Sequence, residues 1–269
     1  MGDVSSCPPL TRSSVQAAHE AIKQHIHRTP TITCDTISHL ASTPQSADSL
    51  KGTPFEGRTP AKPQISLFFK CENYQKIGAF KARGAFHALS RLSKEELSKG
   101  VVTHSSGNHA QALALAARTH GIPAHIVMPT ISTPSKIAAT KGYGANVIFS
   151  GSTSDEREAV VADVIRDTGA ILVPPYDHPN IMLGQGTLAL ELEEQAKDFD
   201  ARGLDAVVAP CGGGGMLSGV ATALHGIGIR VFGSEPSFEG ADDAKRGVES
   251  GERVEKVKTL TIADGLRTR

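Results

Sequence analysis

Short apolar runs alternate with amphipathic stretches along most of this chain, and this alternation limits the folds that it can adopt. Apolar runs that predict strands cover 66–72, 101–106, 124–129, 145–151, 170–175, 205–210 and 230–236. Helical periodicity falls at 14–27, 109–121, 155–169, 186–195 and 216–226. Strands that alternate with helices favour parallel sheets covered by helices on both faces. We therefore expect an α/β fold, with residues 41–64, rich in Ser, Thr, Pro and Gly, as a surface loop.

Charge and composition exclude some classes of function. Lys+Arg and Asp+Glu both number 28, which gives no electrostatic reason to expect nucleic acid or an anionic membrane as a partner. No apolar run approaches the roughly 20 residues that span a bilayer. The four cysteines are scattered and form no C-x-x-C pair, which predicts a cytoplasmic protein.

Four successive glycines, Gly212, Gly213, Gly214 and Gly215, stand between a predicted strand and a predicted helix, and Met216 follows them. Glycines let the backbone approach an anion closely, and the helix that follows adds the positive end of its dipole. The segment predicts a phosphate-binding loop. It is neither a P-loop nor a dinucleotide fingerprint, and the alternative is a flexible connector.

The segment 68–89 carries three lysines, Lys70, Lys76 and Lys81. A lysine that forms a Schiff base must be partly desolvated, so that its amine is neutral at working pH. Lys81 lies in the first turns of a predicted helix among small and apolar residues, which favours it modestly. The alternative is that all three are ordinary surface lysines.

Ser105, Ser106, Asn108 and His109 follow the predicted strand 101–106 and open the next helix. Open α/β sheets bind ligands at the carboxyl ends of their strands, so these residues predict a polar pocket floor that can hold a carboxylate. Because Ser and Asn are also good helix caps, a purely structural N-cap is the alternative.

Taken together, the segments GAFKARGA, THSSGNHAQA, STPSKIAATKGYGA, GQGTLALE and PCGGGGMLSG resemble the fold-type II pyridoxal-phosphate enzymes, and within them the serine racemases and threonine dehydratases. The resemblance runs from about Ala18 to the last residue. It implies two open parallel-sheet domains of the tryptophan-synthase-β-like kind. A large cofactor domain would comprise 1–99 and 178–269, and a small domain would comprise 100–177.

The resemblance also implies roles for particular residues. Lys81 matches the lysine that carries pyridoxal 5'-phosphate and acts as base on one face, and Ser106 matches the acid/base on the opposite face. Asn108 matches the residue that hydrogen-bonds the cofactor's ring oxygen, and Phe80 matches a residue packed near the ring. The glycines and Met216 match the phosphate loop. The implied activity is racemisation of L-serine, with accompanying β-elimination to pyruvate and ammonia, so the enzyme is an isomerase and a lyase. A threonine or serine ammonia-lyase acting on L-threonine or L-serine is the alternative.

Further ligands are implied in the same way. Glu235, the Ala241 carbonyl and Asp243 match the divalent-cation site of the racemases, a hard oxygen set suited to Mg²⁺ or Ca²⁺. Without the resemblance this acidic loop would be a solvated turn. Lys76, Gln111 and Tyr143 fall where racemases contact a nucleotide, which implies ATP as an effector.

Members of the family continue past a TIADGLRT segment, whereas this sequence ends at Arg269. We therefore expect a large domain that is incomplete at its carboxyl end, low stability, weak cofactor retention, and a homodimer only for a complete chain. A non-catalytic shortened form that binds partners is a rival interpretation. A cysteine-synthase-type enzyme fits the Ser-Ser-Gly-Asn-His segment less well.

Overall fold

The computed structural model describes residues 4–105, 107–254, 257 and 259–266. The chain divides into two compact units, one of residues 29–71 and the other of residues 1–28 and 72–269. The smaller unit pairs β1 (Thr31–Thr33) with β2 (Phe68–Lys70) in antiparallel register, Thr31 opposite Lys70. Between these strands lie α2 (Asp35–Ala41), a single 3₁₀ turn (Asp48–Leu50) and irregular chain, as the composition of 41–64 predicted.

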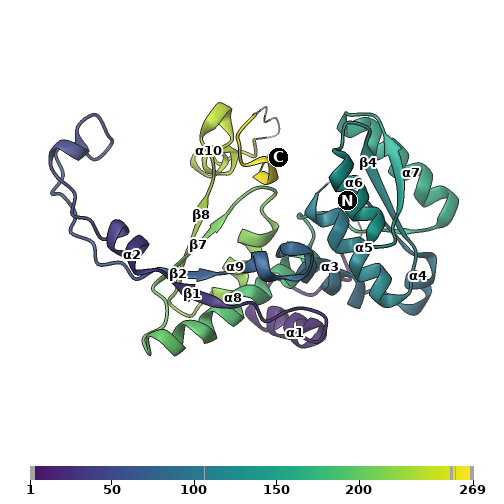
Figure 1. Ribbon diagram of the computed structural model, residues 1–269, viewed down its shortest axis with the longest axis horizontal. Coiled ribbons are helices and arrows are strands. Elements are labelled where there is room, and N and C mark those ends of the chain that lie inside the picture. Colours follow the sequence, from purple (N-terminus) through teal and green to yellow (C-terminus); the bar gives the residue numbers. More distant parts are fainter. Residues whose placement is uncertain (1–3, 106, 255–256, 258, 267–269) are drawn as a thin grey trace. The chain divides into compact units, whose positions relative to one another are not determined.

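The larger unit contains a four-stranded parallel sheet in the order β5-β4-β3-β6. Its strands are β3 (Val101–His104), β4 (Ala124–Pro129), β5 (Asn146–Ser150) and β6 (Ile171–Leu172), and the sheet helices are α4 (Lys94–Lys99), α5 (Asn108–His120), α6 (Pro134–Gly142) and α7 (Ser154–Thr168). Val101 and Ile126 pack with Leu113 of α5, while Val102 and Val127 pack on the opposite face with Val161 and Val164 of α7 (Figure 1). Helices therefore cover both faces of the inner strands, while Phe149 of the edge strand β5 stays 47% exposed.

Local sequence signals fix the ends of these helices. Ser93 and Glu96 form a capping box at the start of α4, and Thr153 and Glu156 form one at the start of α7. In a capping box each side chain accepts a hydrogen bond from the other residue's backbone, which satisfies N–H groups that the helix itself leaves free. α7 ends at Gly169, whose left-handed conformation suits glycine.

A second parallel sheet pairs β7 (Ala206–Pro210) with β8 (Arg230–Ser234). The helices α1 (Arg12–Ile22), α3 (Lys81–Ser90), α8 (Pro179–Phe199), α9 (Gly215–Leu224) and α10 (Asp243–Ser250) complete the larger unit, with short 3₁₀ turns at Glu72–Tyr74, Lys76–Gly78, Phe238–Gly240 and Asp264–Leu266. Val207 and Ala209 of β7 pack into a core formed with α1, α8 and α9. The parallel sheets and alternating helices confirm the predicted α/β class.

Helix α8 approaches two neighbouring helices through glycine. A Cβ atom on Gly186 would lie 2.5 Å from the carbonyl oxygen of Gly219 in α9, and one on Gly184 would lie 2.7 Å from the Cα atom of Gly84 in α3. Real Cβ atoms do not come so close to backbone, so these positions accept glycine alone without a shift of the helices. None of the helices in the described ranges is both long and apolar enough to cross a membrane.

Candidate active site

The larger of two cavities in the described part of the chain, of about 1890 Å³, opens at the carboxyl ends of β3, β6 and β7. This is the edge at which open α/β sheets bind their ligands. The cavity is lined by nearly all of the predicted catalytic and cofactor residues, namely Phe80, Lys81, Asn108, Gly212, Gly213, Gly214, Gly215 and Met216. Residues far apart in the sequence thus meet at one site. Ser106 lies outside the described residues, although its neighbours Ser105 and Gly107 line the same cavity.

Lys81 begins α3 and extends its amine into this cavity. The Nζ atom donates to the carbonyl oxygen of Pro175 at 2.6 Å, and it lies 5.4 Å from the ring centroid of Phe80 and 5.7 Å from that of Tyr176. Burial lowers the pKa of Lys81 to about 8. About one amine in ten is therefore neutral at pH 7, far more than for an exposed lysine.

The other two candidate lysines have different surroundings. Lys70 belongs to β2 of the smaller unit, where its Nζ donates to the carbonyl oxygen of Thr29 at 2.7 Å. Lys76 lies over the ring of Phe86, with its Nζ 5.7 Å from the centroid. Neither lines the large cavity in the part of the chain that the structure describes. The local environment therefore favours Lys81 much more strongly than the sequence did.

The glycine loop connects β7 to α9, which begins at Gly215. Gly214 has a φ of 77°, in the left-handed region that glycine adopts freely. Gly213 and Gly215 lie against Tyr176: a Cβ atom at 213 would overlap the tyrosine ring, and one at 215 would lie 2.7 Å from the tyrosine carbonyl oxygen. The loop thus brings bare backbone and the positive end of α9 to the cavity, beside a residue that the sequence analysis did not select.

His109, in the first turn of α5, is buried in the cavity wall. Its Nε2 atom lies 3.1 Å from the carbonyl oxygen of Val173, which can only accept, so Nε2 carries the proton. Burial, followed by the charge of Lys81, lowers the pKa of His109 to about 3, and the ring is neutral. Among the described residues the buried Nδ1 atom has no hydrogen-bond partner, which leaves one acceptor of the ring unused.

The predicted cation ligands lie beyond β8. The carboxylate of Glu235 accepts from the backbone N–H groups of Ala244 at 3.1 Å and Lys245 at 2.9 Å, and so caps α10. Ala241 is buried, and burial, with the neighbouring charge of Glu235, raises the pKa of Asp243. Within the described ranges no three His, Cys, Asp or Glu side chains gather as a metal site. The set of two carboxylates and one carbonyl stays a prediction.

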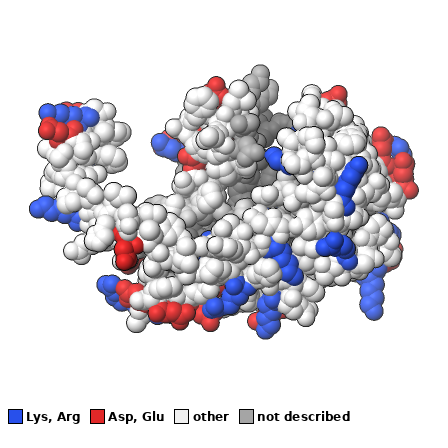
Figure 2. All heavy atoms as spheres, viewed as in Figure 1, with Lys and Arg blue, Asp and Glu red and all other residues white. Residues whose placement is uncertain are grey.

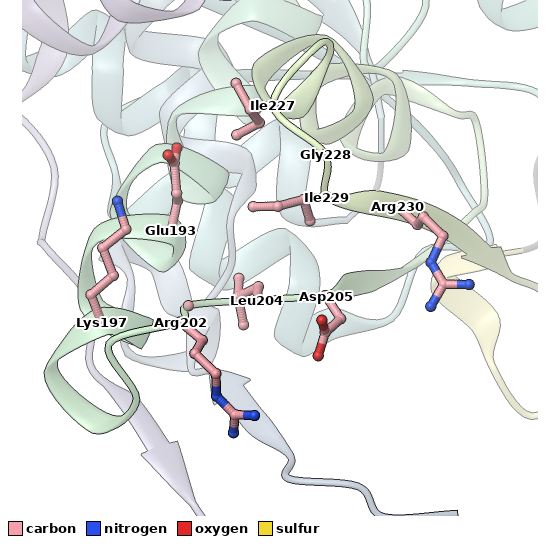
Figure 3. Close-up of a pocket in the computed structure, with 10 residues that line it drawn as sticks. Glu193, Lys197, Arg202, Leu204, Asp205, Ile227, Gly228, Ile229 and Arg230 are labelled. Carbon is pink, nitrogen blue, oxygen red and sulfur yellow. The ribbon is translucent and has the colours of Figure 1, made fainter.

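A second, smaller cavity of about 330 Å³ lies at the amino ends of β7 and β8 (Figure 3). Leu204, Ile227 and Ile229 form its apolar part, and charged side chains surround them (Figure 3). Two of those charges are paired elsewhere, Glu193 with Arg12 at 2.7 Å and Arg202 with Asp200 at 2.6 Å. This hollow lies at the opposite ends of the strands from the lysine and the glycine loop.

Comparison with known proteins agrees with this geometry. A family model described as pyridoxal-phosphate dependent enzyme matches residues 49–269. The chain therefore belongs to the family of pyridoxal-phosphate dependent enzymes.

Individual proteins of the family are similar to this chain over most of its length. The chain is 44% identical to a serine racemase of Arabidopsis thaliana over 256 residues, which cover 94% of this chain and 69% of the relative. It is 40% identical to an L-threo-3-hydroxyaspartate ammonia-lyase of Saccharomyces cerevisiae, over 96% of this chain and 71% of the relative. The solved structure of maize serine racemase superposes with a TM-score of 0.81 at 40% identity, over 96% of this chain and 70% of that one.

Proposed function

We propose that this chain is a pyridoxal-phosphate enzyme that racemises serine and also eliminates its β-hydroxyl group. The observation that carries the proposal is the buried amine of Lys81, in a cavity that the glycine loop also lines. The relatives named serine racemase and hydroxyaspartate ammonia-lyase support the same pair of reactions.

The residues present fit the cofactor in several ways. Gly212–Gly215 and the start of α9 offer backbone donors and a positive helix end for a phosphate group. Glycine is needed there, because side chains at 213 and 215 would fill the space beside Tyr176. Asn108 would hydrogen-bond the cofactor's ring oxygen, and Phe80 would pack near the ring. When bound, pyridoxal phosphate supplies an electron sink that acidifies the α-hydrogen of an amino acid attached to it.

The chain's own residues then handle protons. Lys81, neutral in a useful fraction of molecules, takes a proton from the α-carbon on one face or returns one there. The hydroxyl group of Ser106 does the same on the opposite face, so removal on one side and return on the other inverts the centre. If the β-hydroxyl leaves with a proton as water, hydrolysis of the remaining fragment gives pyruvate and ammonia. His109 stays neutral throughout and offers an acceptor, not a charge.

The test combines a spectrum with product analysis. After addition of pyridoxal 5'-phosphate, we expect a visible absorbance band, and borohydride reduction followed by peptide mass analysis should locate the cofactor on Lys81. Lys81→Ala should abolish both, whereas Lys94→Ala, at an exposed position of α4, should change neither. A band that survives in Lys81→Ala would contradict the assignment.

Products identify the reaction. L-serine, L-threonine and L-threo-3-hydroxyaspartate should be assayed for keto acid and ammonia, and L-serine also for D-serine by chiral chromatography. D-serine from L-serine supports the racemase. Keto acid and ammonia without any D-serine would replace it with an ammonia-lyase.

The remaining proposals concern binding and organisation. We propose Mg²⁺ or Ca²⁺ at Glu235, Ala241 and Asp243, and ATP as an effector near Lys76, Gln111 and Tyr143. We also propose a cytoplasmic location and, for a complete chain, a homodimer. We also propose two domains, a large cofactor domain of residues 1–99 and 178–269 and a small domain of residues 100–177. A rise in melting temperature with Mg²⁺ that is lost in Asp243→Asn would support the metal site, and a melting temperature independent of Mg²⁺ would oppose it.

A further inference from the structure

Arg83 is a fully buried cation, with none of its surface exposed. Its guanidinium group donates to Glu72 through Nε and Nη2, both at 2.8 Å, and to Glu191 through Nη1 at 2.8 Å and Nη2 at 2.9 Å. It also reaches the hydroxyl oxygen of Thr187 at 3.2 Å and the carbonyl oxygen of His27 at 3.4 Å. Two bidentate carboxylates hold one planar fork, an arrangement that permits little rotation.

Arg83 stands two residues after Lys81 in α3. Side chains two positions apart on a helix point about 200° apart around its axis, hence to opposite sides. One rotational setting of α3 therefore places Arg83 between its two carboxylates in the core and Lys81 in the cavity. A turn of the helix that freed Arg83 would also move the lysine.

The segment that precedes Lys81 is also held at His27, whose carbonyl oxygen Arg83 contacts. Gln75, with 3% of its surface exposed, accepts from the backbone N–H of His27 at 2.9 Å and donates to its carbonyl oxygen at 2.7 Å. Ile77 follows with a φ of 59°, a left-handed conformation that β-branched residues avoid. Such a conformation persists only where the surroundings impose it, and here they do so four residues before the lysine.

We propose that Arg83 is a positioning residue, which fixes the direction in which the amine of Lys81 enters the cavity by locking α3 to Glu72 and Glu191. The inference rests on the proposed function, because it takes Lys81 as the lysine that binds the cofactor. Arg83 touches neither the cavity nor the reacting atoms. Its effect reaches them through the setting of the helix.

The competing interpretation is a buried ion cluster that only stabilises the fold. Buried ion pairs often add little net stability, so a loss of stability on substitution would not distinguish the two. A change in the reactivity of the Lys81 amine would distinguish them, since a purely stabilising cluster leaves that amine where it is in every folded molecule.

The first experiment uses Arg83→Lys, which keeps the charge but loses the planar fork. Pyridoxal 5'-phosphate is the probe, and the rate at which it becomes reducible onto Lys81 is followed by peptide mass analysis. We expect a fall of between about tenfold and a hundredfold, as small misplacements of reacting groups produce. Arg91→Lys, at the exposed end of the same helix, is the control and should stay within twofold of the parent.

The second readout needs no cofactor. Reductive methylation with formaldehyde, measured at Lys81 across pH, gives the midpoint at which the amine loses its proton. We expect Arg83→Lys to move this midpoint upward toward an ordinary lysine, because the amine leaves its enclosed position. If both the rate and the midpoint match those of the parent chain, the proposal is wrong.

Should Arg83→Lys fail to fold, Glu191→Gln keeps one hydrogen bond to the fork and loses the charge, and a smaller shift in the same direction is expected. Unchanged rate and midpoint in that folded variant would also overturn the proposal. Failure of the proposed function is a separate outcome: in that case the parent chain itself does not capture pyridoxal phosphate on Lys81.

Discussion

In the four-stranded sheet, α5 covers one face and α7 the other, so Val102 and Val127 are fully buried. In the β7–β8 sheet the described helices cover one face, and the side chains on the other face are exposed, Val208 by 68% and Phe232 by 48%. Parallel sheets are normally buried on both faces. Yet both sheets end in loops that line the same cavity, one loop with polar side chains and the other with glycines.

The two sheets therefore hold their loops in place in different ways. The four-stranded sheet holds Asn108 and His109 by burial of its own strands and helices. The β7–β8 sheet holds the glycine loop by its covered face and by close packing of glycine against Tyr176. Charges of both signs are scattered over the face shown in Figure 2, as expected for a chain with equal numbers of basic and acidic residues.

The largest expected effect comes from placing a carboxylate in each sheet. Val127→Asp buries a charge without a partner and should unfold the chain or cost at least about 4 kcal/mol of unfolding free energy. Val208→Asp, at an exposed strand position, should change it by less than about 1 kcal/mol. Urea unfolding followed by circular dichroism measures both. Equal losses would break the contrast between the sheets.

Acid should act on the loop of the four-stranded sheet through His109. The folded chain keeps this imidazole neutral down to its pKa of about 3, whereas an unfolded histidine takes up a proton near pH 6.5. The unfolded state therefore binds more protons between these values, and stability falls as pH falls, by about 2 kcal/mol from this group at pH 5.

His109→Gln should flatten this dependence between pH 7 and pH 5 in urea unfolding, and His225→Gln, at an exposed position, is the matched control. If the parent chain is as stable at pH 5 as at pH 7, and both variants behave like it, His109 does not cause a loss of stability in acid.

A substitution of comparable or smaller effect tests the loop of the β7–β8 sheet. Gly213→Ala places a methyl group in the ring of Tyr176 and should cost about 1–3 kcal/mol, together with weaker retention of pyridoxal phosphate. Gly142→Ala is the control, because a Cβ atom there meets nothing within 4 Å. Thermal melts and equilibrium dialysis measure the two effects. If Gly213→Ala and Gly142→Ala have the same melting temperature and cofactor retention, the loop can accommodate a side chain at position 213.

Much of the fold could be predicted from the sequence because buried parallel strands are continuous apolar runs. The strands of the four-stranded sheet and β7 and β8 all lie within predicted segments. The helix predicted at 186–195 in fact runs from Pro179 to Phe199. Glycine disfavours helix in isolation, so Gly184 and Gly186 hide the first turns from a reading of the local sequence. Their reason lies in contacts with α3 and α9, which the local sequence does not display.

The motifs of the site could be predicted from the sequence, but the contacts among its residues could not. The local sequence favours Lys81 only modestly over Lys70 and Lys76, and the resemblance to a family selects it. Its burial and its hydrogen bond to the Pro175 carbonyl supply the physical reason. Tyr176 was missed because an aromatic residue after a strand carries no particular signal. Arg83 did leave a signal, because Ala79, Phe80 and Phe86 lie around it at helical spacing and a charge among apolar residues indicates a buried partner. Glu191 left none, since Glu194 and Gln195 follow it on the same helical face. Ser106 remains a prediction.

Helix α8 meets α3, which carries the lysine, and α9, which follows the glycine loop, at pairs of glycines where backbone touches backbone. The spacing between the Lys81 amine and the glycine loop is therefore set deep in the molecule, away from the cavity wall. Anyone reshaping this enzyme for another amino acid can exchange lining side chains and leave that spacing intact. A single methyl group at Gly184 or Gly186 would alter it, with no residue of the cavity touched.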